Sequence, residues 1–312
     1  MIVVPIFLAG CVLLYQGAEW LVRGAAAVAD SLGIPKAVVG LTLVAFGTSA
    51  PELFVNLIAA SQGHTDFALS NVSGSNLANL CVGFGICGLV TRVRIRRDFF
   101  APDLLLQWIA VVLVVVLLLV PVLYHVPLWG VLPLAGLLVI YFISLTRRSQ
   151  VLDSASGCRR TAALGFGLAL LGGVCLYAGG EAVLYASLEI AHTMGISDAL
   201  IGFTIVAVGT SIPDISASII AVRKGEESIA VGNLLGSNIS NVLVVLSGTL
   251  VVARRDLAAN GSILMDYGVL CVLSLIFLIF GHRQQGVSKV LALFLLFCYL
   301  GYMAQRIYFE LA

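Results

Sequence analysis

The chain has 312 residues, of which 60% are hydrophobic and only 11% are charged, and its mean hydropathy is +1.08. No water-soluble domain buries that much apolar surface, so the composition excludes a soluble globular protein and indicates that lipid surrounds most of the chain. The formal net charge of +1 gives no reason to expect a nucleic acid or an acidic partner.

Apolar stretches long enough to cross a hydrocarbon core of about 30 Å recur from end to end. Helices are expected because lipid offers no partners to backbone polar groups. The first stretch lacks the basic leader and cleavage site of a signal peptide, so we expect it to remain as a helix. The predicted spans are residues 2–28, 36–60, 67–90, 103–122, 127–146, 162–190, 199–222, 228–252, 264–281 and 287–307. The expected fold class is an all-α polytopic membrane protein with about ten transmembrane helices.

The basic residues lie mostly on one side of these spans. Placing the N-terminus outside puts every Lys and Arg except Arg254, Arg255 and Arg306 on the cytoplasmic side. The opposite orientation would invert every loop. This bias predicts a multi-pass protein with both termini external.

The two halves of the chain repeat one pattern at an offset of 162 residues. GLTLVAFGTSAPE at residues 40–52 aligns with GFTIVAVGTSIPD at residues 202–214. NVSGSNLAN at residues 71–79 aligns with NLLGSNISN at residues 233–241 in the same register. Because polar letters are preserved along with apolar ones, we interpret the match as an internal duplication.

The duplication predicts the domain organisation. We expect a first five-helix repeat at residues 1–147, a cytoplasmic linker at residues 148–161 and a second five-helix repeat at residues 162–312. The repeated segments span residues 40–79 and 202–241. An odd number of spans inverts the second unit in the membrane, which is typical of secondary transporters.

The first motif of each half ends on an acidic residue that lies inside an apolar span. An ionisable group there costs at least about 2.5–3.5 kcal/mol and is by default a functional hypothesis. Neither residues 40–52 nor residues 202–214 contain Lys or Arg, so a structural ion pair with Glu52 or Asp214 would need a partner from elsewhere. We therefore expect a bound cation to be the counter-charge.

Oxygen-bearing side chains surround each acid in the sequence. Thr48 and Thr210 lie four residues before the acids and share a helix face with them. Soft metals would require Cys or His, which the four aligned motifs lack, whereas calcium takes six to eight oxygen ligands. The candidate ligands are Glu52, Asp214, Thr48, Ser49, Thr210, Ser211, Ser75, Ser237, Asn79 and Asn241.

A proline precedes each acid. Pro51 and Pro213 each remove a backbone donor, so the carbonyls at or near Ala45 and Ala207 become further candidate ligands. A single such segment could be an ordinary kink in which Ser and Thr bond back to the helix. Its recurrence with an acid favours the ion site.

Glu19 and Glu181 also coincide at the repeat offset. Their symmetry indicates a shared role, but two alternatives stay open. Each could be a gating carboxylate on the ion path, or each could make a plain interhelical hydrogen bond.

With these residues in place, the sequence resembles the calcium/cation antiporter superfamily and, within it, the sodium/calcium exchangers of the prokaryotic type. Their two alpha repeats carry G-T-S-x-P-[E/D] followed by G-S-N-x-x-[N/D], and both segments occur twice here. The resemblance implies ten helices, alternating access by sliding of the first and sixth spans, and ion-binding roles for the candidate ligands, including Ala45 and Ala207.

The resemblance also implies which ions move. Relatives that need potassium usually carry Asp at the position of Asn241, so Asn241 indicates a potassium-independent exchanger. Proton-coupled relatives have a different segment, Gly-Asn-x-x-Glu, which favours sodium as the driving ion. We expect exchange of Na⁺ for Ca²⁺ in a prokaryotic plasma (inner) membrane, with no prosthetic group, no enzymatic activity and no obligate protein partner.

Three other functions remain as alternatives. Exchange driven by protons, or exchange of another divalent ion such as magnesium, is compatible with a titratable Glu52. A membrane-embedded hydrolase would need a base beside Ser49 or Ser211, and none is near in sequence. A passive cation channel usually forms a symmetric ring rather than a single chain with an internal repeat.

Overall fold

The computed structural model describes residues 3–119, 128–149, 159–193, 209–253, 261–284 and 286–311. Eight helices in this part of the chain are long and apolar enough to cross a bilayer, and the bent pair Lys36–Ala50 and Glu52–Ser61 would add one more span. This confirms an all-α chain with multiple spans. The predicted span at 199–222 begins outside the described residues, and most of the 148–161 linker lies outside them. The ten crossings and the linker therefore remain predictions.

The first half of the chain forms its spans in order, several of them built from consecutive helical segments. Its elements are α1 (Val3–Leu32), α2 (Lys36–Val39), η1 (Gly40–Val44), α3 (Ala45–Ser61), α4 (Thr65–Leu77), η2 (Ala78–Gly83), α5 (Phe84–Val90), β1 (Val93–Arg94), α6 (Arg97–Leu119) and α7 (Leu128–Ser149).

The second half follows the same plan. Its elements are α8 (Arg159–Thr193), α11 (Ile212–Arg223), α12 (Glu227–Ser240), η5 (Asn241–Leu246), α13 (Ser247–Ala253), α14 (Gly261–Gln284), β2 (Gly286–Val287) and α15 (Lys289–Leu311).

Three spans contain a π-helical stretch that the sequence did not predict. η1 joins α2 to α3, η2 joins α4 to α5, and η5 joins α12 to α13. Single-turn π-helical insertions in α-helices are rare and often lie at functional sites. η2 and η5 begin at Ala78 and Asn241, so they occupy nearly the same place in each repeat.

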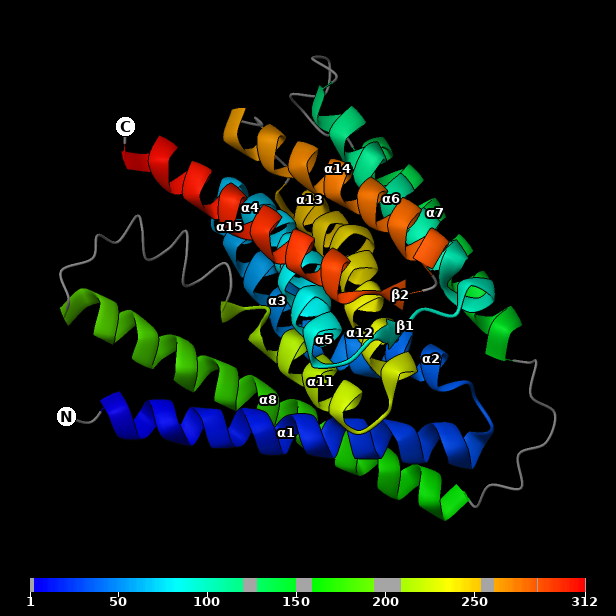
Figure 1. Ribbon diagram of the computed structural model, residues 1–312. Helices are drawn as coiled ribbons and strands as arrows, with labels where there is room; N and C mark the ends of the chain where they lie inside the picture. Colours follow the sequence, from blue (N-terminus) through cyan, green and yellow to red (C-terminus); the bar gives the residue numbers. More distant parts are fainter. Residues whose placement is uncertain are drawn as a thin grey trace.

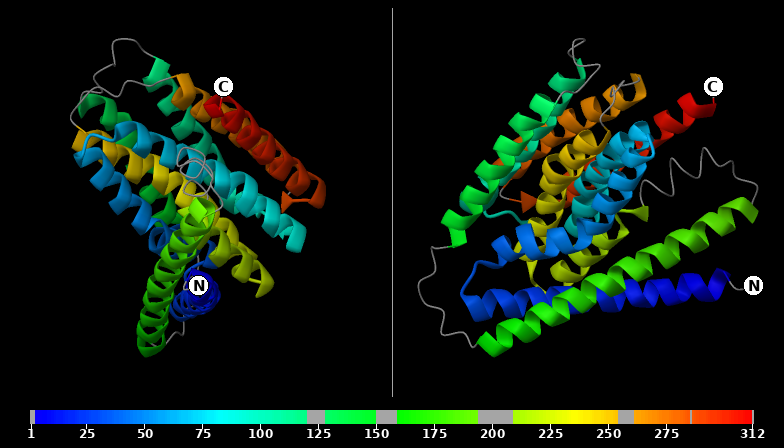
Figure 2. Two further views of the ribbon diagram at one scale, coloured as in Figure 1. Left: turned by 90° about the vertical axis from the view of Figure 1, so that its left-hand side faces the viewer. Right: turned by 180° about the vertical axis from the view of Figure 1, so that it is seen from behind.

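Helices α1 and α8 form an antiparallel pair that crosses the remaining helices obliquely (Figures 1 and 2). Glycines make the two backbones meet. A Cβ on Gly17 would lie 2.8 Å from the Gly172 carbonyl oxygen, and a Cβ on Gly10 would lie 3.0 Å from that of Gly179. Residues 10 and 17 become 172 and 179 at the repeat offset, so one contact is made twice with the halves exchanged.

The centre of the molecule is built from the two spans that carry the second repeated motif. Glu227–Ala253 and Phe67–Val90 are the most deeply enclosed of the candidate spans. Asn76 Nδ2 donates to the Asn238 carbonyl oxygen at 3.2 Å, and Asn238 Nδ2 donates to the Asn76 carbonyl oxygen at 3.4 Å. These residues are 162 positions apart, so this contact is also reciprocal.

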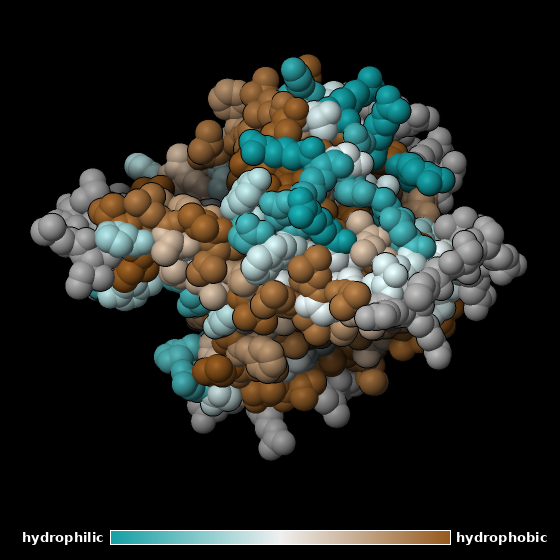
Figure 3. All heavy atoms as spheres, turned by 90° about the horizontal axis from the view of Figure 1, so that it is seen from below, coloured by the Kyte–Doolittle hydropathy of each residue, from teal (hydrophilic) through white to brown (hydrophobic). Residues whose placement is uncertain are grey.

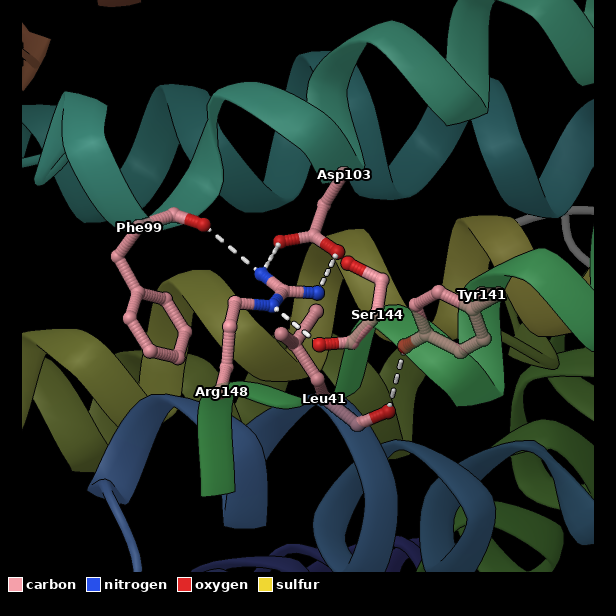
Figure 4. A network of polar contacts seen from close by, with 6 residues as sticks. All are labelled: Leu41, Phe99, Asp103, Tyr141, Ser144 and Arg148. Atoms are coloured by element: carbon pink, nitrogen blue, oxygen red, sulfur yellow. Dashed lines mark hydrogen bonds and ion pairs between the residues drawn. The ribbon is translucent and has the colours of Figure 1, made fainter. Parts of the chain in front are cut away.

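A buried ion pair joins the last two helices of the first half (Figure 4). Arg148 on α7 donates two hydrogen bonds to the Asp103 carboxylate on α6, at 2.6 and 2.8 Å, and a third to the Phe99 carbonyl oxygen. About two helix turns away on α7, the Tyr141 hydroxyl donates to the Leu41 carbonyl oxygen at 2.9 Å. The network thereby fixes α7 against η1, just before the acidic segment of α3.

The second half has an Asp–Arg pair of its own. Asp266 on α14 accepts a hydrogen bond from the Tyr302 hydroxyl at 2.9 Å and lies 3.3 Å from Arg306 Nε on α15. Each half therefore ties its last two helices with a buried charge pair.

The two halves are also joined by a short antiparallel ladder in which Val93 pairs with Val287 and Arg94 with Gly286.

The outer surface is largely apolar. Figure 3 shows one face on which hydrophobic side chains dominate and hydrophilic ones gather in one area. Large exposed side chains such as Phe54, Leu164 and Phe297 are each more than 60% exposed. Such surface is stable only in lipid, which agrees with a membrane-embedded chain.

Candidate functional site

The two predicted acids lie buried in the middle of the molecule. Glu52 is 2% exposed and Asp214 is fully buried. Glu52 follows Pro51, where the span between Lys36 and Ser61 bends by 47°. Asp214 lies in the first turn of α11, directly after Pro213. Glu52 lines a small cavity together with Thr210 and Pro213, which precede Asp214 in the second copy of the motif, so the two acids belong to one region.

The Asp214 carboxylate is held by side chains from both halves. Asn79 Nδ2, in η2, donates to Oδ2 at 2.6 Å. Ser237 Oγ, in α12, donates to Oδ1 at 3.0 Å. Hydrogen bonds to a charged acceptor are short and roughly twice as strong as neutral ones. Both oxygens of this acid therefore have protein partners.

Thr48 connects the bend of α3 to the second half. Its Oγ1 lies 3.0 Å from the Val44 carbonyl oxygen, 3.1 Å from that of Ala45 and 3.1 Å from Asn233 Oδ1. One hydroxyl proton serves one of these acceptors at a time. Thr48 thus bonds back to its helix, as the ordinary-kink alternative requires, and also reaches the other repeat.

The equivalent contact exists in the other half. Thr210 Oγ1 donates to Asn71 Oδ1 at 3.3 Å and lies 3.2 Å from Ser75 Oγ. Asn71 and Asn233 are equivalent at the repeat offset, as are Thr48 and Thr210. The threonine of each half is therefore paired with the asparagine of the opposite half.

The Glu52 side of the site differs sharply from the Asp214 side. Both carboxylate oxygens of Glu52 are buried without a hydrogen-bond partner, and so are both side-chain polar atoms of Asn241. Buried polar groups left unpaired cost about 1–3 kcal/mol each, and charged groups cost more. Further unpartnered atoms nearby in the motifs are Ser49 Oγ, Ser211 Oγ, Asn71 Nδ2 and Asn79 Oδ1.

These atoms suit a hard cation. The unpaired set is dominated by carboxylate, hydroxyl and amide oxygens, which are the ligands that calcium prefers in proteins. Within the described ranges no Lys or Arg forms an ion pair with either acid, and no group of three or more His, Cys, Asp or Glu is assembled. The chemistry of the site therefore favours sodium or calcium over a soft metal.

The structure brings most of the predicted residues together. Hydrogen bonds connect Thr48 with Ala45, Ser75 with Thr210, and Asp214 with Asn79 and Ser237. Glu52, Ser49, Ser211 and Asn241 are also buried, and their side-chain oxygens have no hydrogen-bond partner among the described residues. Ala207 lies outside the described residues.

Sequence reasoning missed Asn71 and Asn233. Asn233 Nδ2 donates to the Asp214 carbonyl oxygen and to Ser218 Oγ, both at 2.9 Å, so it fixes the turn that carries the acid. The signal was present, because both asparagines open the second repeated motif and coincide at the offset. In apolar spans such a preserved amide needs a polar partner.

A hydrolytic site is not supported by this arrangement. Ser49 and Ser211 have no hydrogen-bond partner through their hydroxyl oxygens, so neither is activated by a base in the described part of the chain.

Comparison with known proteins places the chain among membrane transporters. A family model described as sodium/calcium exchanger protein matches residues 2–148 and 164–308. CaxA of Alkalimonas amylolytica is 35% identical, covering 97% of this chain and 98% of that protein. The sodium/calcium exchanger MaX1 of Methanosarcina acetivorans is 29% identical, with 97% and 98% covered. The solved structure of the sodium/calcium exchanger from Methanococcus jannaschii aligns with a TM-score of 0.83 at 23% identity, covering 97% of each chain.

Proposed function

Because the chain belongs to the sodium/calcium exchanger protein family, we propose that it exchanges Na⁺ for Ca²⁺ across a membrane by alternating access and without K⁺. The observation that carries this proposal is the buried, unpartnered carboxylate of Glu52, which lines one cavity with Thr210 and Pro213 of the segment that carries Asp214. Two negative charges neutralise one calcium ion or two sodium ions, so the two cations compete for one cluster. We assign the ligand roles to the twelve predicted residues, including Ala207.

The proposed mechanism uses the two halves as inverted repeats. In this proposal the chain makes ten crossings with both termini external, and residues 1–147 and 162–312 are the repeats that residues 148–161 join. The reciprocal contacts Gly10–Gly179 and Gly17–Gly172, together with Asn76–Asn238, support this arrangement. The glycines let the backbones of α1 and α8 pack closely against each other, so the two helices can move together past the site. The proposed location is a prokaryotic inner membrane.

Potassium independence rests on Asn241. Both polar atoms of its side chain are buried without partners, which leaves its amide oxygen available to a cation while adding no third charge. We expect calcium uptake to be unchanged when potassium replaces choline in the assay medium. A dependence on potassium would contradict this part of the proposal.

The decisive experiment is ⁴⁵Ca²⁺ uptake into sodium-loaded vesicles, with and without an outward sodium gradient, for the parent protein, Glu52→Gln and Asp214→Asn. Unit charges about 4 Å apart attract by about 4 kcal/mol at an effective dielectric constant of about 20, so losing either carboxylate should reduce uptake by about 100-fold or more. Glu189→Gln, an exposed carboxylate on α8, is the matched control. Its uptake should equal that of the parent.

Other outcomes separate the alternatives. Uptake that ignores sodium but follows a pH gradient would identify a proton-coupled exchanger. Uptake that needs no counter-ion would indicate a channel, and uptake retained in both acid variants would show that the ion site lies elsewhere.

A further inference from the structure

A small cavity connects the buried acid to helix α8. It has a volume of about 30 Å³ and is lined by Glu52 and Thr210 on one side and by Gly180, Glu181 and Leu184 of α8 on the other. A space of this size holds about one or two water-sized particles. Gly180 is close to the first turn of α11, because a Cβ on it would lie 3.3 Å from Pro213 Cγ. Glu52 and Glu181 therefore line the same cavity.

Glu181 differs from Glu19, its equivalent in the first half. Glu19 is paired with Arg23 on α1 and with Lys224, whose Nζ lies 3.1 Å away at the end of α11. Glu181 is exposed and has no ion pair among the described residues. Among the described residues, Glu19 therefore has cationic partners and Glu181 has none, and Glu181 lines a cavity that Glu52 also lines.

We propose that Glu181 is the carboxylate that receives the incoming cation and passes it through this cavity to Glu52. The inference rests on the proposed function and adds a recruiting residue to the same site. Glu181 lies in the later part of α8, which runs away from the basic residues at its start and thus toward the proposed outer side. A fixed negative charge at the mouth of a low-dielectric passage raises the local cation concentration and the rate of association.

The charge of the ion determines how strongly this residue acts. A carboxylate attracts a divalent cation twice as strongly as a monovalent one at the same distance. Loss of the Glu181 charge should therefore affect external calcium more than external sodium. The equivalent pairing of Glu19 with Lys224 leaves no free charge at the corresponding position of the other half in this structure.

The test is the KM for external calcium in right-side-out, sodium-loaded vesicles, compared with the KM in inverted vesicles. For Glu181→Gln we expect the external KM to rise about tenfold at low ionic strength, with the maximal rate unchanged and the KM in inverted vesicles unchanged. Glu181→Asp should restore the parent KM because it keeps the charge. High choline chloride should reduce the difference, because salt screens exposed charges. Glu189→Gln is again the control.

The outcomes distinguish this inference from the function on which it rests. If the parent shows no sodium-driven calcium uptake, the exchanger proposal fails. If the parent transports calcium but Glu181→Gln leaves the external KM unchanged, or lowers the maximal rate equally from both sides, the recruiting role is wrong and the exchanger proposal stands.

Discussion

The two halves of this protein carry the same motifs but treat their acids differently. The carboxylate of Asp214 accepts hydrogen bonds from Asn79 and Ser237, whereas the carboxylate of Glu52 accepts none. Perfect symmetry would give Glu52 the equivalent bonds from Asn241 and Ser75. Asn241 instead has no partner, and Ser75 contacts Thr210. Sequence repetition thus specifies equivalent residues without making their contacts equivalent in one conformation.

The backbone explains part of this difference. Pro213 stands at the start of α11, which places Asp214 in a first turn, where free backbone N–H groups favour negative charge. Pro51 and Glu52 lie in the interior of α3, which begins at Ala45, so Glu52 is not in a first turn of that helix. The protein itself stabilises one acid, and the other depends more on a bound cation.

The largest expected effect separates the two acids in the absence of sodium and calcium. Asp214→Asn loses two charge-assisted hydrogen bonds, and we expect the free energy of unfolding to fall by about 3 kcal/mol. Glu52→Gln removes a buried charge without partners, so stability should be unchanged or higher. Thermal unfolding of the ion-free protein in detergent measures both. Equal losses in the two variants would contradict the asymmetry.

A somewhat smaller effect concerns stabilisation by calcium. A ligand present at about 100 times its Kd stabilises the folded protein by about 2.7 kcal/mol. We expect this gain in the parent and in Glu189→Gln, and its loss in Glu52→Gln and Asp214→Asn alike. The asymmetry of the ion-free protein should therefore disappear when ion binding is the readout. A calcium-induced rise in Tm that persists in Glu52→Gln would place the ion elsewhere.

The smallest effect tests the reciprocal contacts. Asn76→Ala and Asn238→Ala each remove one buried hydrogen bond of the same kind, so each should cost about 1 kcal/mol. The two variants should lose equal stability in the same unfolding assay. Clearly unequal losses would show that the halves differ even at their central contact.

Much of this architecture could be predicted from the sequence. Hydropathy predicted the spans that lie in the described part of the chain, and the offset of 162 residues identified the equivalent positions. What could not be predicted is which side chain faces which. The contact between Asn79 and Asp214 joins opposite halves. A sequence repeat shows which residues are equivalent, but it does not show which residues touch. The π-helical turn at Asn241 was also missed, because its letters resemble those of any apolar helix.

The buried ion pairs were missed for a different reason. Arg148 and Arg306 were used to assign the sides of the membrane, which assumes basic residues in water. Instead Arg148 reaches back to Asp103, and Arg306 lies beside Asp266. An arginine at a helix end has a long side chain that can extend along the helix, so its position in the sequence does not determine where its charge lies.

The β1–β2 ladder joins the two halves independently of the linker between them. β1 belongs to the first half and β2 to the second, and their backbone hydrogen bonds tie the segment before α6 to the segment before α15. Contacts of α12 with η1 and of α14 with α6 join the halves again. None of these contacts needs the covalent connection between residues 148 and 161. Two fragments separated within that connection and produced in the same cell should therefore reassemble into one working molecule.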